Sequence, residues 1–240
     1  MREAPLPAPD RRKIIRDGIA IGIASGAYGI SFGAIGVTSG LNVWQTCVTS
    51  LLVFTGASQF ALVGVLGAGG APLAGAASGL LLGSRNTLYA LRLAPMLDFR
   101  GVRRVAAAHL VIDESTAMAV SRETRTGART GFLATGGAVF VLWNLATLAG
   151  ALAGDRLGDP RRYGLDAAVG GAFLALLWPR LKETRNRVVA VLAAALALTL
   201  VPLTPAGVPV LAAAVVALGM GLLTRNASDS TEVPGREDLP

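Results

Sequence analysis

Long uncharged stretches dominate the hydropathy pattern of this 240-residue chain. From Gly18 to Ser84, 67 residues pass without an Asp, Glu, Lys, Arg or His. At about 1.5 Å per helical residue, that stretch could cross a hydrocarbon core of about 30 Å roughly three times. Three more uncharged segments follow, at 130–154, 167–179 and 188–224. The pattern predicts an all-α, polytopic membrane protein.

Turn residues divide these stretches into separate helices. Gly40 and Pro72 interrupt the first stretch, and a proline-rich turn at 202–209 divides the last. Segment 105–120 is apolar at both ends but contains three ionisable residues, so it is either one more span or a half-buried segment. The predicted spans cover residues 18–38, 44–67, 72–97, 131–154, 163–180, 186–203 and 207–224.

The positions of Lys and Arg distinguish seven spans from eight. With eight spans and the N-terminus inside, 14 basic residues fall on the cytoplasmic side and 6 outside. With seven spans, the best orientation places 12 basic residues on the cytoplasmic side and 8 outside, and it puts the basic N-terminus outside. The positive-inside rule favours eight spans with both termini cytoplasmic. We therefore expect a cytoplasmic basic segment at 1–17, a transmembrane transport domain at 18–224 and a polar, disordered tail at 225–240.

Composition agrees with a membrane location and excludes several other functions. Hydrophobic residues make up 52% of the chain and charged residues 15%. Basic loops between spans account for the net charge of +7, so no nucleic-acid partner is predicted. A single cysteine, Cys47, excludes an intrachain disulfide, and a single histidine argues against a transition-metal site. No Walker A loop is present. We expect no metal or cofactor, and a gradient as the energy source.

Glycines recur at helical spacing in two of the predicted spans. In lipid, small residues let helix backbones approach closely, and this contact supplies much of the association energy. We therefore interpret these glycines as packing positions rather than as substrate ligands. They are Gly18, Gly22, Gly26, Gly29 and Gly33 in the first span, and Gly75, Gly79 and Gly83 in the third.

Polar side chains at mid-span point most directly to function, because each must be satisfied away from water. The first such cluster consists of Thr55, Gly56, Ser58 and Gln59. It fits a second helix broken near Gly56, whose exposed amides and carbonyls could bind a substrate. It fits equally a continuous helix in which Ser and Thr bond back to preceding carbonyls.

The second cluster consists of Arg85 and Asn86 with Tyr89 and Arg92, and the third contains His109, Asp113 and Glu114. Arg85 lies deep in its span and could receive a carboxylate through bidentate hydrogen bonds. A helix through 105–120 would place His109 and Asp113 on one face. This trio could bind an amine or a coupling proton, or it could form the solvated face of an interfacial helix.

These three clusters, in this order, resemble the AzlC family of branched-chain amino acid permeases. The resemblance implies a multi-span inner-membrane protein that exports branched-chain amino acids with a small, separately encoded AzlD-type membrane partner. The family usually has Asn two residues before the Arg and His just after it, where this chain has Gly83 and Asn86. The matching stretches are SLLVFTGASQFALVGVLGAGGAPL (50–73), RNTLYALRLAPML (85–97), HLVIDESTAMAV (109–120) and GLDAAVGGAFLALLWPRLK (164–182).

Our hypothesis is that five polar residues converge on one cavity for the amino acid: Ser58, Gln59, Arg85, Asp113 and Glu114. A non-transporting scaffold subunit is the first alternative. A membrane-embedded serine hydrolase using Ser58 and His109 is the second, and we disfavour it because no oxyanion hole is apparent, so no catalytic residue is assigned. Proton-coupling candidates are His109, Asp113 and Glu114. Predicted substrate-binding residues are Thr55, Gly56, Ser58, Gln59, Arg85, Tyr89, Asp113 and Glu114.

Overall fold

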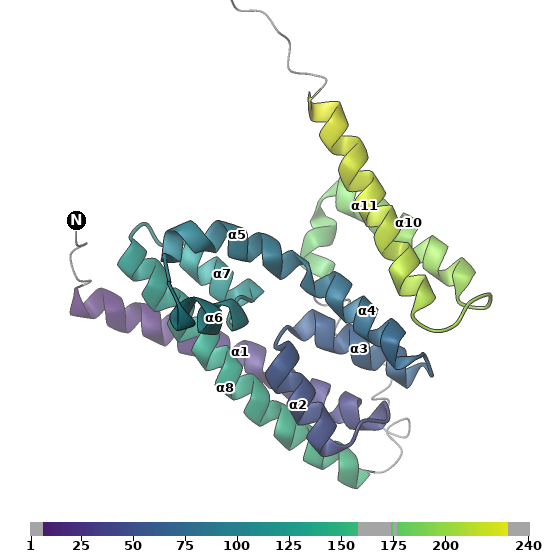
Figure 1. Ribbon diagram of the computed structural model, residues 1–240, viewed down its shortest axis with the longest axis horizontal. Helices are drawn as coiled ribbons and strands as arrows, with labels where there is room; N and C mark the ends of the chain where they lie inside the picture. The colour runs from purple at the N-terminus through teal and green to yellow at the C-terminus, as the bar shows by residue number, and fades with distance from the viewer. Residues whose placement is uncertain (1–6, 158–173, 175–176, 230–240) are drawn as a thin grey trace, which may run out of the picture. The chain divides into compact units, whose positions relative to one another are not determined.

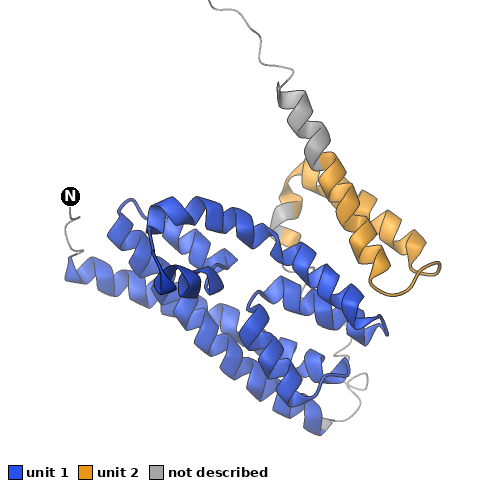
Figure 2. Cartoon of the chain, viewed as in Figure 1, with its two compact units in different colours: residues 1–173 blue, residues 174–240 orange. Residues whose placement is uncertain are grey.

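The structure, a computed structural model, describes residues 7–157, 174 and 177–229. All regular elements in this part of the chain are helical, which confirms the predicted fold class there. The chain divides into two compact units, residues 1–173 and residues 174–240 (Figure 2). Every predicted site residue belongs to the first unit.

Two long parallel helices, α1 (Ala8–Thr38) and α8 (Arg125–Leu157), form the frame of the first unit (Figure 1). Gly18 faces Thr135 and Gly33 faces Ala151, so residue numbers rise together along the two helices. In the described part of the chain, these are the two helices long and apolar enough to cross a membrane. They contain the predicted spans 18–38 and 131–154.

The α1 glycines bring the two helices into backbone contact. A Cβ atom on Gly22 would lie 2.7 Å from the Cβ of Ala138. A Cβ on Gly26 would lie 2.8 Å from the Cβ of Leu142. Both distances are shorter than real Cβ contacts, so only glycine permits this approach. The prediction that these glycines serve helix packing is confirmed.

The predicted span 44–67 is a hairpin that turns back on itself. Its arms are α2 (Val43–Val53) and α3 (Gly56–Gly67), and we call residues 43–67 the first hairpin. Thr46 packs against Gly36, and Gly67 packs against Ser39. Both ends of the hairpin therefore lie beside the C-terminal end of α1. Of the two alternatives for this segment, the structure contains the break near Gly56, and the chain reverses there instead of continuing.

Helices α4 (Pro72–Gly83) and α5 (Arg85–Leu97) run back along the whole first unit, with a bend at Ser84. Close contacts of Gly75 with Leu62, and of Gly79 with Ser58, make α4 antiparallel to α3 and confirm a packing role for these glycines. At the other end, the guanidinium of Arg129 in α8 donates to the Leu97 carbonyl at 2.6 Å. The predicted span 72–97 thus connects the two ends of α8.

A second hairpin, residues 102–120, enters the unit from the opposite end. Its arms are α6 (Val102–His109) and α7 (Asp113–Val120). Ala107 packs in a cluster with Phe132 near the start of α8, and Met118 packs against Gly131. The helix is interrupted at 110–112. The expectation that His109 and Asp113 share one helix face was therefore wrong, because they lie on different helices.

The second unit contains η2 (Trp178–Lys182) and a pair of helices, α10 (Thr184–Leu200) and α11 (Val208–Asp229). Gly207 has φ +100° in the turn that joins them, a conformation that favours glycine. These helices match the predicted spans 186–203 and 207–224, and α11 continues five residues beyond the second. Most of the predicted span 163–180 and the tail from residue 230 lie outside the described residues. The number of membrane crossings stays a prediction.

Candidate functional site

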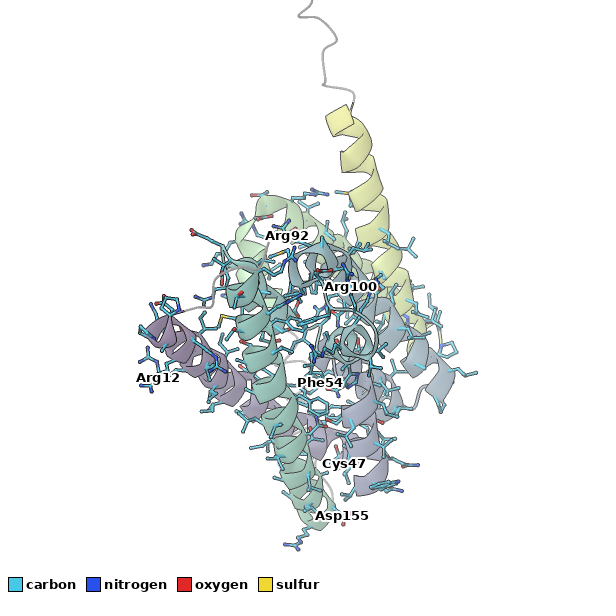
Figure 3. All side chains as sticks on the ribbon, turned by 60° about the vertical axis from the view of Figure 1, so that its left-hand side comes forward. Arg12, Cys47, Phe54, Arg92, Arg100 and Asp155 are labelled. Atoms are coloured by element: carbon cyan, nitrogen blue, oxygen red, sulfur yellow. The ribbon has the colours of Figure 1, made fainter. Side chains whose placement is uncertain are left out.

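The tips of the two hairpins meet near the middle of the first unit. The ring of Phe54 lies 5.8 Å from the ring of His109 and 5.0 Å from that of Phe140. The Nε2 atom of His109 lies 2.9 Å from the Leu51 carbonyl oxygen. Because a carbonyl only accepts, Nε2 carries the proton in this contact. Figure 3 shows Phe54 between the end that contains Arg100 and the end that contains Asp155.

Side chains satisfy the carbonyls that the helix breaks leave without helical partners. Gln59 Nε2 donates to the Ser50 carbonyl at 3.2 Å, next to the break of the first hairpin. In the second hairpin, Ser115 Oγ donates to the Leu110 carbonyl at 2.6 Å. Asn86 Nδ2, from α5, donates to the Val111 carbonyl at 3.0 Å. Such caps allow non-helical backbone at membrane depth.

A cavity of about 320 Å³ lies at the meeting point of the tips. Thr55, Asn86, Thr87 and His109 are its polar side chains, and apolar residues form the rest of its wall. This mixture is typical of a small-molecule site. Asn86 belongs to the second polar cluster of the sequence but was not among the predicted substrate-binding residues. The full lining is Val53, Phe54, Thr55, Asn86, Thr87, Ala90, Ala108, His109 and Val111.

Three of the predicted site residues form one ionic cluster. Each of them is close in sequence to a residue that lines this cavity. Arg85 Nη2 lies 2.6 Å from Asp113 Oδ2, and Tyr89 Oη donates to Asp113 Oδ1 at 2.7 Å. Both carboxylate oxygens of Asp113 are therefore engaged. The Arg85 and Asp113 side chains are 33% and 40% exposed, so the cluster is partly open. The bend at Ser84 places Arg85 at the start of α5, level with the second hairpin's tip.

Glu114 makes a separate contact with the frame. Its Oε1 atom accepts a hydrogen bond from Ser25 Oγ of α1 at 3.0 Å. This bond joins the second hairpin to α1 across 89 positions of sequence. Ser25 was missed by the sequence analysis, because a serine among the α1 glycines is unremarkable without its partner.

The remaining predicted residues of the first hairpin are buried in contacts between helices. Gly56 starts α3 and lies against the indole of Trp143, where a Cβ would come within 3.1 Å. Ser58 is 1% exposed, and its Oγ lies 3.4 Å from Thr55 Oγ1. Gln59 is fully buried. Ser58 packs on α4 and His109 bonds to Leu51, so these two side chains form no hydrogen-bonded dyad of the kind that a serine hydrolase needs.

None of the five residues expected to converge on one cavity lines this cavity, although Arg85 and Asp113 contact each other. Of the predicted set, Thr55 and His109 line the cavity between the tips, while Arg85, Tyr89 and Asp113 form the ionic cluster. Their roles in substrate binding stay predictions.

Broken helices that meet around polar groups within an apolar helical unit are typical of multi-span transport proteins, where such breaks mark ligand paths. A family model described as AzlC protein matches residues 20–157, more than half of the chain. The chain belongs to the AzlC family of branched-chain amino acid permeases. The matched region contains both hairpins and every predicted site residue. No curated protein and no solved structure matches the chain.

Proposed function

We propose that this protein exports branched-chain or related apolar amino acids across the cell (inner) membrane, driven by a gradient and together with a small AzlD-type membrane partner. Family membership supports transport of branched-chain amino acids. The meeting of two hairpin tips around a cavity of about 320 Å³ is the observation that supports a transport path. An apolar side chain of the substrate would pack on Phe54 and Val111 there.

An amino acid is a zwitterion, so its path needs partners for a carboxylate and for an ammonium group. Arg85 and Asp113 already form such a pair of opposite charges at 2.6 Å. Arg85 directly precedes Asn86, and Asp113 lies two positions after Val111. Asn86 and Val111 both line the cavity. We infer that the substrate inserts into this pair, its carboxylate on the Arg85 guanidinium and its ammonium on the Asp113 carboxylate. The exchange conserves net charge, which limits the cost at membrane depth.

The distribution of basic residues supports a cytoplasmic N-terminus. In the described part of the first unit, ten basic residues lie at one end. They belong to the first turns of α1 and to the connections at 98–104 and 121–129. The opposite end has Arg156. By the positive-inside rule, the first end faces the cytoplasm. In this topology the second hairpin enters from the cytoplasm, the first enters from outside, and both serve as re-entrant segments.

An efflux assay tests the proposal. Cells without their own exporters are grown with toxic valine, leucine, isoleucine or methionine, with and without the small partner. We expect the wild-type protein to restore growth and to lower the intracellular amino acid. Thr55→Val, which removes a hydroxyl from the cavity, should lower efflux about tenfold, the effect of losing one hydrogen bond of about 1.4 kcal/mol. The same change in α10, Thr199→Val, is the matched control.

Purified protein in liposomes distinguishes a transporter from a scaffold. Substrate movement in the presence of the partner, or without it, would support the proposal. No movement under any imposed gradient, with or without the partner, would contradict it and favour the non-transporting scaffold.

A further inference from the structure

The three ionisable residues around the second hairpin's break have different partners. Asp113 is held by Arg85 and Tyr89, which occupy both of its oxygens. A guanidinium has donors and no acceptor, so a protonated Asp113 would leave Arg85 facing a neutral acid. A proton on Asp113 would therefore break an ion pair.

His109 is also committed to a structural contact. Its Nε2–H donates to the Leu51 carbonyl, and its ring packs against Phe54 and Phe140. The contact joins the two hairpins and uses the proton on Nε2.

Glu114 differs because its partner is a hydroxyl. Ser25 Oγ can donate to the ionised carboxylate, as it does at 3.0 Å, or accept from the protonated carboxyl after the hydroxyl rotates. Both protonation states of Glu114 therefore keep a hydrogen bond. No Lys or Arg in the described residues forms an ion pair with Glu114. Its negative charge adds to a neutral Arg85–Asp113 pair, and an uncompensated charge at this depth is costly.

The helices around α7 supply few other charges. On α1, Tyr28 is the one ionisable residue between Asp17 and the end of the helix, and it is 53% exposed. On α8, no ionisable residue lies between Arg129 and Asp155, and Arg129 binds main-chain carbonyls at the cytoplasmic end.

On α5, Arg85 and Tyr89 both contact Asp113, and the remaining ionisable side chain, Arg92, is exposed. On the hairpin itself, Arg103 and Arg104 lie at the start of α6, and His109 faces the first hairpin. Glu114 is thus the acidic group near the tips that is free to gain and lose a proton without breaking an ion pair.

We propose that Glu114 is the proton-binding carboxyl that couples amino acid export to a proton gradient. This inference rests on the proposed transport function. A proton from the acidic side binds the Glu114 carboxylate and leaves to water on the other side, with no other bond made or broken. Because the Glu114–Ser25 bond joins the second hairpin to α1, protonation alters the contact between the hairpin and the frame.

Two assays in proteoliposomes separate coupling from transport, with the small partner included. Counterflow measures exchange of labelled valine without a net driving force, and an imposed pH gradient measures proton-driven accumulation. We expect Glu114→Gln, which mimics the protonated acid, to lower the ratio of proton-driven accumulation to counterflow at least about tenfold. Glu123→Gln, at an exposed position, is the control and should retain both.

Three results would overturn the inference. Glu114→Gln could accumulate valine from a pH gradient as the wild type does. Wild-type accumulation could follow a sodium gradient and ignore the pH gradient. Finally, the wild type could show no counterflow, which would overturn the proposed transport function as well. Counterflow therefore distinguishes a failure of the transport proposal from a failure of the coupling proposal alone.

A second variant tests the same group if Glu114→Gln does not fold. Ser25→Ala removes the donor to the ionised carboxylate and leaves the acid in place. Both forms then lose a hydrogen bond, but the bond to the ionised carboxylate is the stronger, so the midpoint of the transport–pH profile should move to higher pH, by roughly half a unit to one unit. Ser31→Ala, on the same helix, should leave the midpoint unchanged. A Ser25→Ala profile that coincides with the wild type would also overturn the inference.

Discussion

At the scale of single residues, the contact between Arg85 and Asp113 links stability with the proposed path. The two groups meet at 2.6 Å in a site that is about one third exposed. Removing one partner leaves the other charge without its counter-ion, which is more damaging than removing both.

We predict that Arg85→Ala lowers the free energy of unfolding by about 1–3 kcal/mol, and that Asp113→Ala does so similarly. The double variant should lose clearly less than the sum of the two, because neither charge is then stranded. Thermal unfolding in detergent measures this, with Arg92→Ala as the control. Strictly additive losses would mean that the ion pair does not form.

Sequence reasoning found the charged residues of the site but not their partners. Arg85, Asp113 and Glu114 stand out because ionisable groups are rare in apolar segments. Ser25 and Ser115 do not, because serine is common in membrane helices and its role depends on which carbonyl or carboxylate lies opposite. The expected role of Gln59 in substrate binding stays a prediction, and its amide nitrogen donates to the Ser50 carbonyl. A polar side chain in mid-span needs a hydrogen-bond partner, and the tertiary structure determines which group supplies it.

At the scale of helices, the contact between α1 and α8 depends on glycine. At Gly33, a Cβ would meet the Thr147 carbonyl oxygen and the Ala151 amide nitrogen, both of them backbone atoms that cannot move aside. At Gly137 on α8, no atom lies within 4 Å of the added Cβ.

We predict that Gly33→Ala lowers the free energy of unfolding by about 1–3 kcal/mol through overpacking. Gly137→Ala should be neutral or stabilising by up to about 1 kcal/mol, because alanine favours helix and meets no neighbour. Detergent unfolding of the two variants compares them directly. If Gly33→Ala were as stable as Gly137→Ala, the close approach of the two helices would be refuted.

The two helix breaks differ in how well local sequence indicates them. Gly56 and its polar neighbours made a break in the first hairpin a clear alternative, and the structure contains it. Segment 105–120 has no glycine or proline, so local propensity predicts one helix. The break at 110–112 depends on distant residues: Asn86 caps Val111, and Gly136 lets Leu110 approach α8. Such tertiary contacts are invisible in a local window.

At the scale of the whole first unit, the direction of the hairpins changes the meaning of the charge pattern. Counting each apolar segment as a span placed several arginines outside. With both hairpins turning back, the connections at 98–104 and 121–129 lie at the same end as the start of α1. Charge statistics record which side a loop is on. They do not record whether the chain between two loops crosses the membrane or returns.

The central claim is that residues 43–67 and 102–120 are re-entrant hairpins from opposite sides. Single cysteines in a chain whose Cys47 is replaced by Ser test it with a membrane-impermeant maleimide. We predict that Gln45→Cys and Ala68→Cys both react from outside intact cells, and that Arg103→Cys and Glu123→Cys both react only after the cytoplasmic side is opened. Reaction of the two members of either pair from opposite sides would show that the segment between them crosses the membrane, and would contradict the account.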